Sequence, residues 1–433
     1  MPQSTNKTIY QIISLCIGFL GIQIGFALQA GNVTRILQNF GADLTQVSLF
    51  WLIAPLCGAL VQPLIGYLSD RHLNKGNTRV PYLLFGSFLC SLALFALPNA
   101  DILIGLGAPL LIGGILIIII DISFNISMHP LRAAITDYVP IYQQSRGFAV
   151  QTFLISIGAI LGSTLPYILH EFLGLKTISI DNQISENVKW SFYIGSSILL
   201  LCILITSNAI SKNTRINQKV KAESKGKTFY IPQIPHKMWK LSLIQFFSWA
   251  AFFLIWIYMT PALSQHFYKE FDYSAKSTDY ASAANYTGVV FGIYHFSASL
   301  FAIALPYLYK RITIINTHIF ALSIGGIGLL WVYNCNDVSQ LYLPMLCIGI
   351  AWGSILASPF ALLSRFIPSQ KIGLYFGLFN LSITIPQILV GLCSGIILET
   401  FFDGEAVFAL VFASCFLFLA AFSALAFRKS LRL

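Results

Sequence analysis

Charged residues are scarce in this chain. Asp, Glu, Lys and Arg make up only 10% of its 433 residues, whereas 56% are hydrophobic, and the mean hydropathy is +0.75. A soluble globule of this size needs far more polar surface than such a composition supplies. The sequence therefore excludes a water-soluble domain and predicts an integral membrane protein.

Two other patterns are missing. The apolar segments do not alternate polar and apolar residues over about ten positions, as the strands of a membrane barrel do. The eight cysteines show neither metal-ligand spacing nor a disulfide framework. Most of them fall inside apolar segments, where they are typical of small core side chains. The sequence thus predicts no metal site and no cofactor.

Long uncharged runs are the main feature that is present. A helix needs roughly 20 residues to cross about 30 Å of hydrocarbon. Cutting the chain at its charged and Pro, Gly or Asn clusters leaves about twelve such runs. The expected spans are 10–32, 46–68, 81–98, 106–135, 148–170, 190–210, 238–265, 285–309, 314–334, 340–364, 373–399 and 406–427. The expected fold is all-α, with twelve transmembrane helices.

The basic residues concentrate on one side of this topology. The connections on the N-terminal side hold most of the 26 Lys and Arg residues, including a dense run from Lys212 to Lys240. The positive-inside rule then places both termini in the cytoplasm. This distribution also explains the +10 net charge without a nucleic-acid partner. Residues 1–7 are polar and no small-residue cleavage site follows them, so we expect no removable signal peptide.

A polar stretch at 211–237 divides the spans six and six. It is rich in Lys, Asn, Ser and Gln, which is typical of a flexible linker between two bundles, 1–210 and 238–433. Span four into span five echoes span ten into span eleven, since Pro130 and Gly147 recur as Pro359 and Gly373. The echo favours a parallel duplication.

Asp121 lies alone in an uncharged run, and the matching position of the second half is near Ile350. A carboxylate at that depth costs at least about 2.5–3.5 kcal/mol to insert, so it is a functional hypothesis by default. Its pKa can be raised by desolvation and lowered by a polar neighbour, which is what proton coupling needs. Asn125 follows one turn later on the same face. We expect these two residues to couple proton movement, and the alternative is a structural Asp held by helix–helix hydrogen bonds.

Several motifs resemble a known family. Residues 66–79 are similar to the Gly-x-x-x-Asp loop of the major facilitator superfamily, with a stretched spacing after Asp70. Residues 25–71 and the stretch from Asp121 to Asp137 look like the sucrose–proton symporters of the glycoside-pentoside-hexuronide cation symporter group. Residues 351–359 and 377–387 resemble bacterial members that are assigned to maltose or related glucosides. Span seven, 238–265, departs from the pattern of the plant proteins, so the resemblance does not assign sucrose as the substrate.

The resemblance implies the major facilitator fold, with two six-helix halves, in a bacterial inner membrane. It also implies a cytoplasmic charge network that is made and broken as the halves rock. The expected gate residues are Asp70, Arg71, Arg79, Arg132, Asp137 and Arg146. The alternative is an ordinary juxtamembrane charge cluster that satisfies topology.

A neutral sugar is bound by amides, hydroxyls and aromatic faces. Candidates of these types at mid-membrane depth are Gln29, Asn32, Gln62, Trp256, Tyr258, Tyr294, His295, Trp352, Asn380 and Gln387. His295 has two readings, since its imidazole can join a proton path or stay a neutral hydrogen-bonded group. Arg35 has two as well, an outer gate with Asp43 or a side chain that reaches the interface.

The sequence thus favours a proton-coupled importer of a neutral disaccharide, maltose or a related α-glucoside, that works as a monomer in contact with membrane lipid. Sodium is the alternative ion. Rival functions are a proton-linked exporter of sugars or amphipathic compounds, a lipid-linked membrane glycosyltransferase and a non-transporting sensor. The enzyme would need a metal or paired-acid cluster near the interface, and the sequence shows none.

Overall fold

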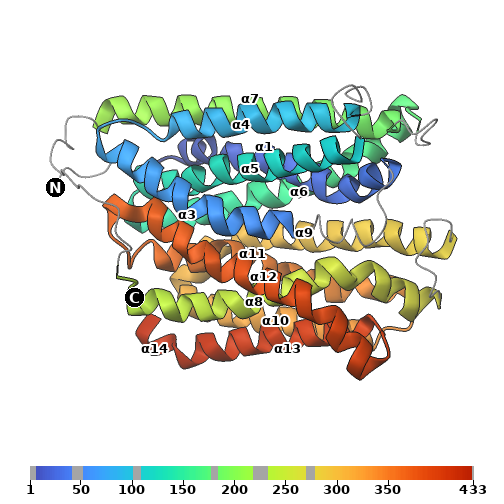
Figure 1. Cartoon of the computed structure of the whole chain (residues 1–433). Helices are drawn as coiled ribbons and strands as arrows, with labels where there is room; N and C mark the ends of the chain where they lie inside the picture. The colour runs from blue at the N-terminus through green and yellow to red at the C-terminus, as the bar shows by residue number, and fades with distance from the viewer. Residues whose placement is uncertain are drawn as a thin grey trace. The chain divides into compact units, whose positions relative to one another are not determined.

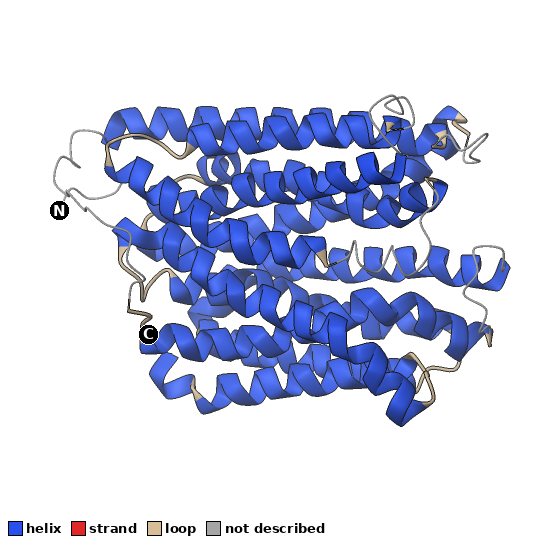
Figure 2. Ribbon diagram, in the orientation of Figure 1, coloured by secondary structure: helices blue, strands red, loops and turns tan. Residues whose placement is uncertain are grey.

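A computed structural model describes residues 6–40, 52–100, 109–176, 184–217, 233–269 and 278–431. These ranges fold into helices joined by turns, without a strand among them (Figure 2). The long helices are α1 (Ile9–Asn39), α3 (Ile53–Asn74), α4 (Val80–Ala96), α5 (Pro109–Tyr138), α6 (Gln144–Leu173), α7 (Glu186–Asn217), α8 (His236–Leu263), α9 (Thr278–Ile312), α10 (Ile314–Tyr333), α11 (Tyr342–Leu363), α12 (Ile372–Phe402) and α13 (Val407–Ala426). The short ones are η1 (Leu97–Asn99), η3 (Ile141–Gln143), η5 (Ser264–Tyr268), η6 (Val338–Leu341), η7 (Ser369–Lys371) and α14 (Arg428–Leu431).

Each of the twelve expected spans overlaps one of these long helices. Eleven helices in the described ranges are long and apolar enough to cross a membrane. The remaining one is α3, and the first residues of its expected span, 46–51, lie outside the described residues. Several helices extend past the expected ends, as α7 does in reaching Asn217. Apolar runs mark only the hydrocarbon, whereas the helical hydrogen bonds continue into the polar region.

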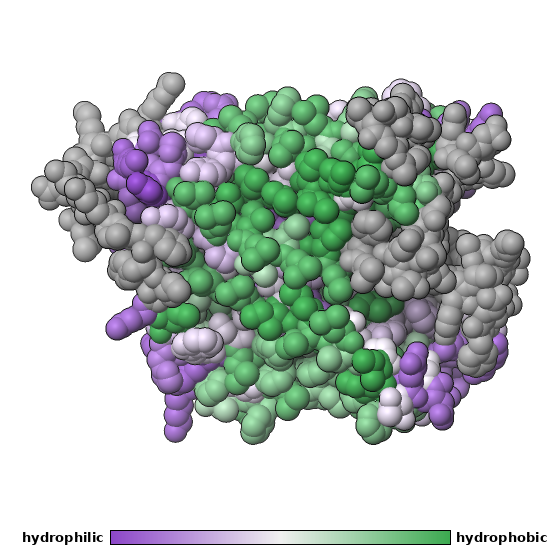
Figure 3. Space-filling view, viewed as in Figure 1, coloured by the Kyte–Doolittle hydropathy of each residue, from purple (hydrophilic) through white to green (hydrophobic). Residues whose placement is uncertain are grey.

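The helical surface is apolar, as expected for contact with lipid. On the face shown in Figure 3, hydrophobic residues cover the middle of the helices and hydrophilic residues lie toward their ends. Large apolar side chains are exposed along α3 and α4, among them Leu60, Leu64, Phe85, Phe88 and Phe95. Such a surface is stable in hydrocarbon, where the backbone polar groups are satisfied within each helix.

The described contacts divide the chain into two compact units. The first is Met1–Ile231 together with Ile367–Asn380, and the second is Pro232–Phe366 together with Leu381–Leu433. The division cuts α12, because its first turns pack with helices of the first unit. The sequence boundaries, 1–210 and 238–433, assign all of α12 to the second bundle and stay a prediction.

The same helix pairs occur in both units. In the first, α4 packs against α5 and α7, and α3 against α5 (Figure 1). In the second, α10 packs against α11 and α13, and α9 against α11. Each of these helices takes the same place in the order of its own half. The shared pattern supports the duplication that the sequence echo predicts.

Glycines let α1 and α6 of the first unit approach closely. A Cβ atom on Gly158 would lie 2.6 Å from the main-chain oxygen of Leu20, and one on Gly162 would lie 2.6 Å from that of Ile24. Small residues at helix contacts are typical of membrane bundles, where packing drives association. These contacts hold α1, and Gln29 with it, in place.

Candidate functional site

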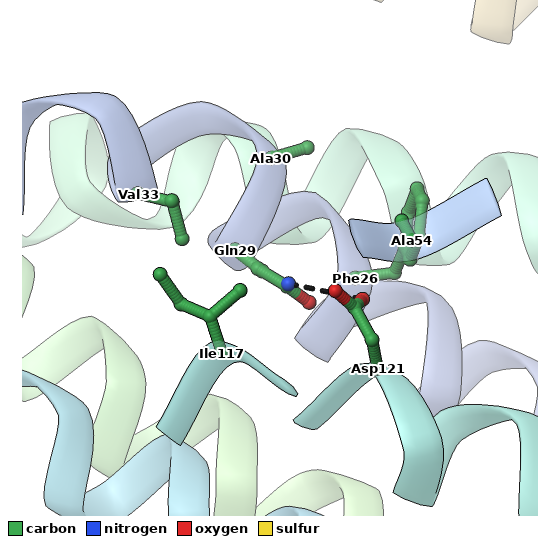
Figure 4. A pocket seen from close by; sticks show the side chains of 7 residues that line it. All are labelled: Phe26, Gln29, Ala30, Val33, Ala54, Ile117 and Asp121. Atoms are coloured by element: carbon green, nitrogen blue, oxygen red, sulfur yellow. Dashed lines mark hydrogen bonds between the residues drawn. The ribbon is translucent and has the colours of Figure 1, made fainter. Parts of the chain in front are cut away.

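A pocket in the first unit reaches Asp121. Residues of α1, α3 and α5 line it: Phe26, Gln29, Ala30, Val33, Ala54, Ile117 and Asp121. In Figure 4 the side chains of Gln29 and Asp121 point toward one another, with Val33 and Ile117 beside them. Asp121 is only 3% exposed. The sequence thus places a carboxyl group and one amide, that of Gln29, among apolar lining residues.

Neutral amides surround this carboxyl group. Gln29 donates from Nε2 to Asp121 Oδ1 over 3.1 Å. Asn125 donates from Nδ2 to the main-chain oxygen of Asp121 over 2.7 Å, and its Oδ1 accepts a hydrogen bond from Gln62 Nε2. The four predicted residues therefore form one polar group that links α1, α3 and α5.

Two amide oxygens of this group lack a hydrogen-bond donor among the described residues, and one of them belongs to Gln29, which lines the pocket. Gln29 Oε1 and Gln62 Oε1 are buried, and neither accepts a hydrogen bond from the part of the chain that the structure describes. Buried polar atoms are ordinarily satisfied by protein, water or ligand. A hydroxyl group of a bound molecule would satisfy either oxygen.

No cation neutralises Asp121 within the described ranges, where both ion pairs involve Arg79. Arg132 lies on the same helix but 11 positions further on, which is about 16 Å along a straight helix. Within the described ranges, the Asp121 carboxyl group is therefore hydrogen-bonded by one amide, Gln29, and forms no ion pair.

A second group of predicted residues meets in the second unit. Trp256 of α8 donates from Nε1 to the hydroxyl oxygen of Tyr294 on α9 over 3.2 Å. The ring centroids of Trp256 and Trp352 lie 5.5 Å apart at 86°, and the His295 ring lies 6.5 Å from that of Trp352. Four of the predicted sugar ligands thus form an aromatic cluster on α8, α9 and α11.

Two members of the aromatic cluster were not predicted. The ring centroid of Trp249 lies 5.4 Å from that of Trp352, and that of Phe252 lies 4.7 Å from it. Their spacing from Trp256 is the signal that could have found them, since positions 249, 252 and 256 share one face of a helix.

Some polar atoms of the aromatic cluster also lack a hydrogen-bond partner among the described residues. Trp249 Nε1, Trp352 Nε1 and His295 Nδ1 are buried and have no hydrogen-bond partner among the described residues. Aromatic faces with free hydrogen-bonding atoms suit a sugar ring, which presents apolar CH groups and hydroxyls.

The remaining four sugar candidates have other surroundings. Asn32 donates to the Leu28 oxygen of its own helix over 2.9 Å. The hydroxyl groups of Tyr258 and Ser394 are hydrogen-bonded at 2.9 Å. Asn380 donates to the Gly58 oxygen over 3.3 Å, and Gln387 is buried in α12. The structure thus does not bring these four into the aromatic cluster, and Asn32 does not line the pocket.

Three of the expected gate residues form a buried charge network. Arg79 donates to Asp70 Oδ1 and to Asp137 Oδ2, each over 2.6 Å. Asp70 in turn accepts from the main-chain N–H of Gly373 over 3.0 Å and from that of Leu374 over 2.7 Å. These two donors belong to the first turn of α12, where intrahelical acceptors are missing and a carboxylate is favoured.

The other three gate candidates differ in burial. Arg71 and Arg146 are exposed, and Arg132 is buried at 5% exposure. The expected outer pair, the side chain of Arg35 with Asp43, lies outside the described part of the chain. Among the residues that the structure describes, no group of three His, Cys, Asp or Glu side chains could hold a metal ion.

A comparison with protein-family models assigns the chain to a family. The model of the Major Facilitator Superfamily matches residues 15–391. The chain belongs to this superfamily. This membership and the sugar permease relatives indicate a transporter and set aside the glycosyltransferase alternative. The predicted all-helical, multi-pass fold is confirmed.

Curated relatives of this major facilitator protein cover most of its length. Sucrose transport protein SUC4 of Arabidopsis thaliana is 25% identical over 428 residues, which cover 87% of this chain and 81% of that protein. Sucrose transport protein SUT5 of Oryza sativa is 24% identical and covers 92% of this chain and 84% of its own. The general alpha-glucoside permease of Schizosaccharomyces pombe is 26% identical over 277 residues, 59% of this chain and 48% of the permease.

Solved structures show the same fold at low sequence identity. A bacterial homologue of the iron transporter ferroportin has a TM-score of 0.69 and 14% identity, covering 98% of this chain and 100% of its own. The proton:xylose symporter XylE has a TM-score of 0.69 and 13% identity, covering 97% of this chain and 95% of its own. At these identities the likeness concerns the fold alone.

Proposed function

We propose that this major facilitator protein is a proton-coupled symporter that imports a neutral disaccharide, maltose or a related α-glucoside, with Asp121 as the protonation site. The relatives that transport sucrose or α-glucosides by name support the substrate class. Alternating access of two six-helix halves would move the sugar. The proposal includes a bacterial plasma membrane, cytoplasmic termini and a functional monomer.

The observation that supports it best is the setting of Asp121. Its carboxyl group is buried, lines a pocket and has an amide, Gln29, as its side-chain partner. A structural carboxylate in a membrane usually pairs with a cation. A carboxylate held only by neutral donors can change its charge without leaving an unpaired cation behind.

Gln29 can sense the charge of Asp121. When Asp121 is ionised, Gln29 donates to it from Nε2. When Asp121 is protonated, its hydroxyl becomes a donor while its other oxygen stays an acceptor, and an amide that turns can accept from the hydroxyl through Oε1. That turn exposes Nε2 toward the pocket, where a sugar hydroxyl can accept from it. Proton binding and sugar binding would then favour each other.

The aromatic cluster of the second unit also has groups of the carbohydrate-binding kind. Trp249, Trp256 and Trp352 offer ring faces, and sugars bind to such faces through CH groups. Trp249 and Trp352 also have indole N–H groups without a partner among the described residues.

Uptake into proteoliposomes tests the proposal. Radiolabelled maltose is offered under an inward proton gradient, with sucrose and trehalose as competitors, to the wild type and to Asp121→Asn. We expect the wild type to accumulate maltose and the variant to retain exchange without accumulation, because Asn keeps the shape but cannot bind a proton. Equal accumulation by both would assign a structural role to Asp121. A sodium gradient in place of the proton gradient distinguishes the two ions.

An exporter of amphipathic compounds is the second candidate. Five of the seven residues that line the pocket are apolar, which suits a substrate more hydrophobic than a sugar. An exporter would move protons in the direction opposite to its substrate, whereas a symporter moves both in the same direction. The sign of the pH change that maltose causes in lightly buffered vesicles separates the two functions.

A further inference from the structure

One residue outside the predicted gate holds the first turn of α12. His129 of α5 is fully buried, and its Nε2 lies 2.6 Å from the main-chain oxygen of Gly373. A carbonyl oxygen can only accept, so Nε2 carries the proton. His129 therefore donates to α12 from the helix that also bears Asp121.

Asp70 and His129 both form hydrogen bonds to the main chain of Gly373, one to its N–H and one to its oxygen. Asp70 Oδ1 accepts from the Gly373 N–H over 3.0 Å, and His129 Nε2 donates to the Gly373 oxygen. The two peptide groups that flank the Gly373 Cα are thus bonded to side chains of α3 and α5. Asp70 also accepts from the Leu374 N–H, so its carboxylate holds the N–H groups of this turn, and His129 holds a carbonyl group of the same turn.

The main chain around these hydrogen bonds leaves no room for a side chain at Gly66 or Gly373. A Cβ atom on Gly66 would lie 2.3 Å from the Gly373 oxygen and 2.9 Å from His129 Nε2. One on Gly373 would lie 2.6 Å from Asp70 Oδ1 and 3.0 Å from Arg79 Nη1. The imidazole therefore reaches its acceptor through a gap that two facing glycines leave open.

We propose that His129 is a positioning residue of the cytoplasmic gate, which acts through the Gly373 carbonyl to keep the first turn of α12 docked on α3 and α5. The word gate rests on the proposed transport function. The docking itself does not, and it can be measured without any substrate.

Cross-linking across the contact tests this role. Asn74 donates to the Gln370 oxygen over 3.0 Å, and both side chains are exposed. Cysteines introduced at these two positions, with a protease site inserted in the 211–237 linker, report docking as a disulfide that joins the two fragments on a non-reducing gel. Single-cysteine variants at each position show the background from the native thiols.

We compare the cross-linking rate in four versions of the full chain: the wild type, His129→Leu, His129→Gln and Ser127→Ala. His129→Leu keeps the volume but removes the donor, and it should slow cross-linking at least about threefold, the factor expected for the loss of one buried hydrogen bond. His129→Gln carries an N–H at similar reach and should restore the rate. Ser127 lies on α5, as His129 does, and donates to the Leu83 oxygen of α4. Ser127→Ala removes this bond without touching α12, and it should leave the wild-type rate unchanged.

Three results would overturn the proposal. They are a wild-type rate in His129→Leu, no recovery in His129→Gln, or an equal loss in Ser127→Ala, which would mean general loosening. If His129→Leu fails to fold, His129→Gln is compared with His129→Asn, whose amide is too short to reach. Equal rates in that pair would also refute the role. If the four cross-linking rates are as expected but the protein takes up no maltose, the docking role stands and the transport proposal is rejected.

Discussion

At the scale of single residues, the central feature is a carboxyl group whose partner can act both as donor and as acceptor. Gln29 binds Asp121 with one end of its amide, and the other end is buried without a partner in the described chain. A Lys or Arg in its place would fix Asp121 in the charged state. A neutral amide permits both protonation states, which a coupling site needs.

Replacing Gln29 by Leu tests this arrangement. We expect the KM for sugar to rise about tenfold or more, because a buried polar group that loses its partner costs about 1–3 kcal/mol. Asn32→Leu is the matched comparison, since Asn32 lies on the same helix and bonds to the Leu28 oxygen by the contact described above. Uptake kinetics in proteoliposomes measure both. An equal rise in the two variants would argue against a specific role for Gln29.

At the scale of helices, most positions were predictable and their ends were not. Apolar run length places the spans within a few residues, because the hydrocarbon thickness sets it. All four residues of the polar group around Asp121 were candidates from the sequence, since amides at membrane depth are costly without partners. Asp121 and Asn125 were expected to couple protons and Gln29 and Gln62 to bind sugar, and the sequence did not predict that the four meet. Trp249, Phe252 and His129 were missed, because aromatic residues are common in this chain and only a neighbouring helix gives them a function.

The contact of α3 with the first turn of α12 gives a prediction at this scale. Gly66→Ala should reduce transport at least about tenfold, since its Cβ would lie 2.3 Å from the Gly373 oxygen and backbone atoms cannot yield at that distance. The protein should stay folded, because the clash affects only the docked state. Uptake kinetics and the amount of folded protein after purification measure the two effects separately.

A second glycine serves as the control for that variant. A Cβ atom on Gly288 of α9 would meet no atom of the described chain within 4 Å, so Gly288→Ala should transport normally and gain roughly 0.5–1 kcal/mol of helix stability. Normal uptake by Gly66→Ala would show that the transport cycle does not need the close contact.

At the scale of the whole molecule, the basic residues decide how the chain lies in the membrane. The run from Lys212 to Lys240 is the densest, and positive segments stay on the cytoplasmic side. Both termini and the linker are therefore expected to face the cytoplasm.

A protease site in the linker tests this orientation. Protease added to inside-out vesicles should cut the 211–237 segment, and protease added outside intact spheroplasts should not. The fragments are counted on a gel, and lysed spheroplasts show that the site can be cut. Cleavage from the outside would reverse the proposed topology and exchange the two sides of the gate.

The sequence by itself determined the membrane class and the apolar runs, and it singled out Asp121 as a functional candidate, because hydrophobic length and the cost of a buried charge are local properties. Only the tertiary structure decided which groups meet. Gln29 reaches Asp121 across 92 positions of the chain, and His129 reaches Gly373 across 244. A hydrogen bond depends on distance and direction in space, which a one-dimensional pattern of apolar residues does not contain.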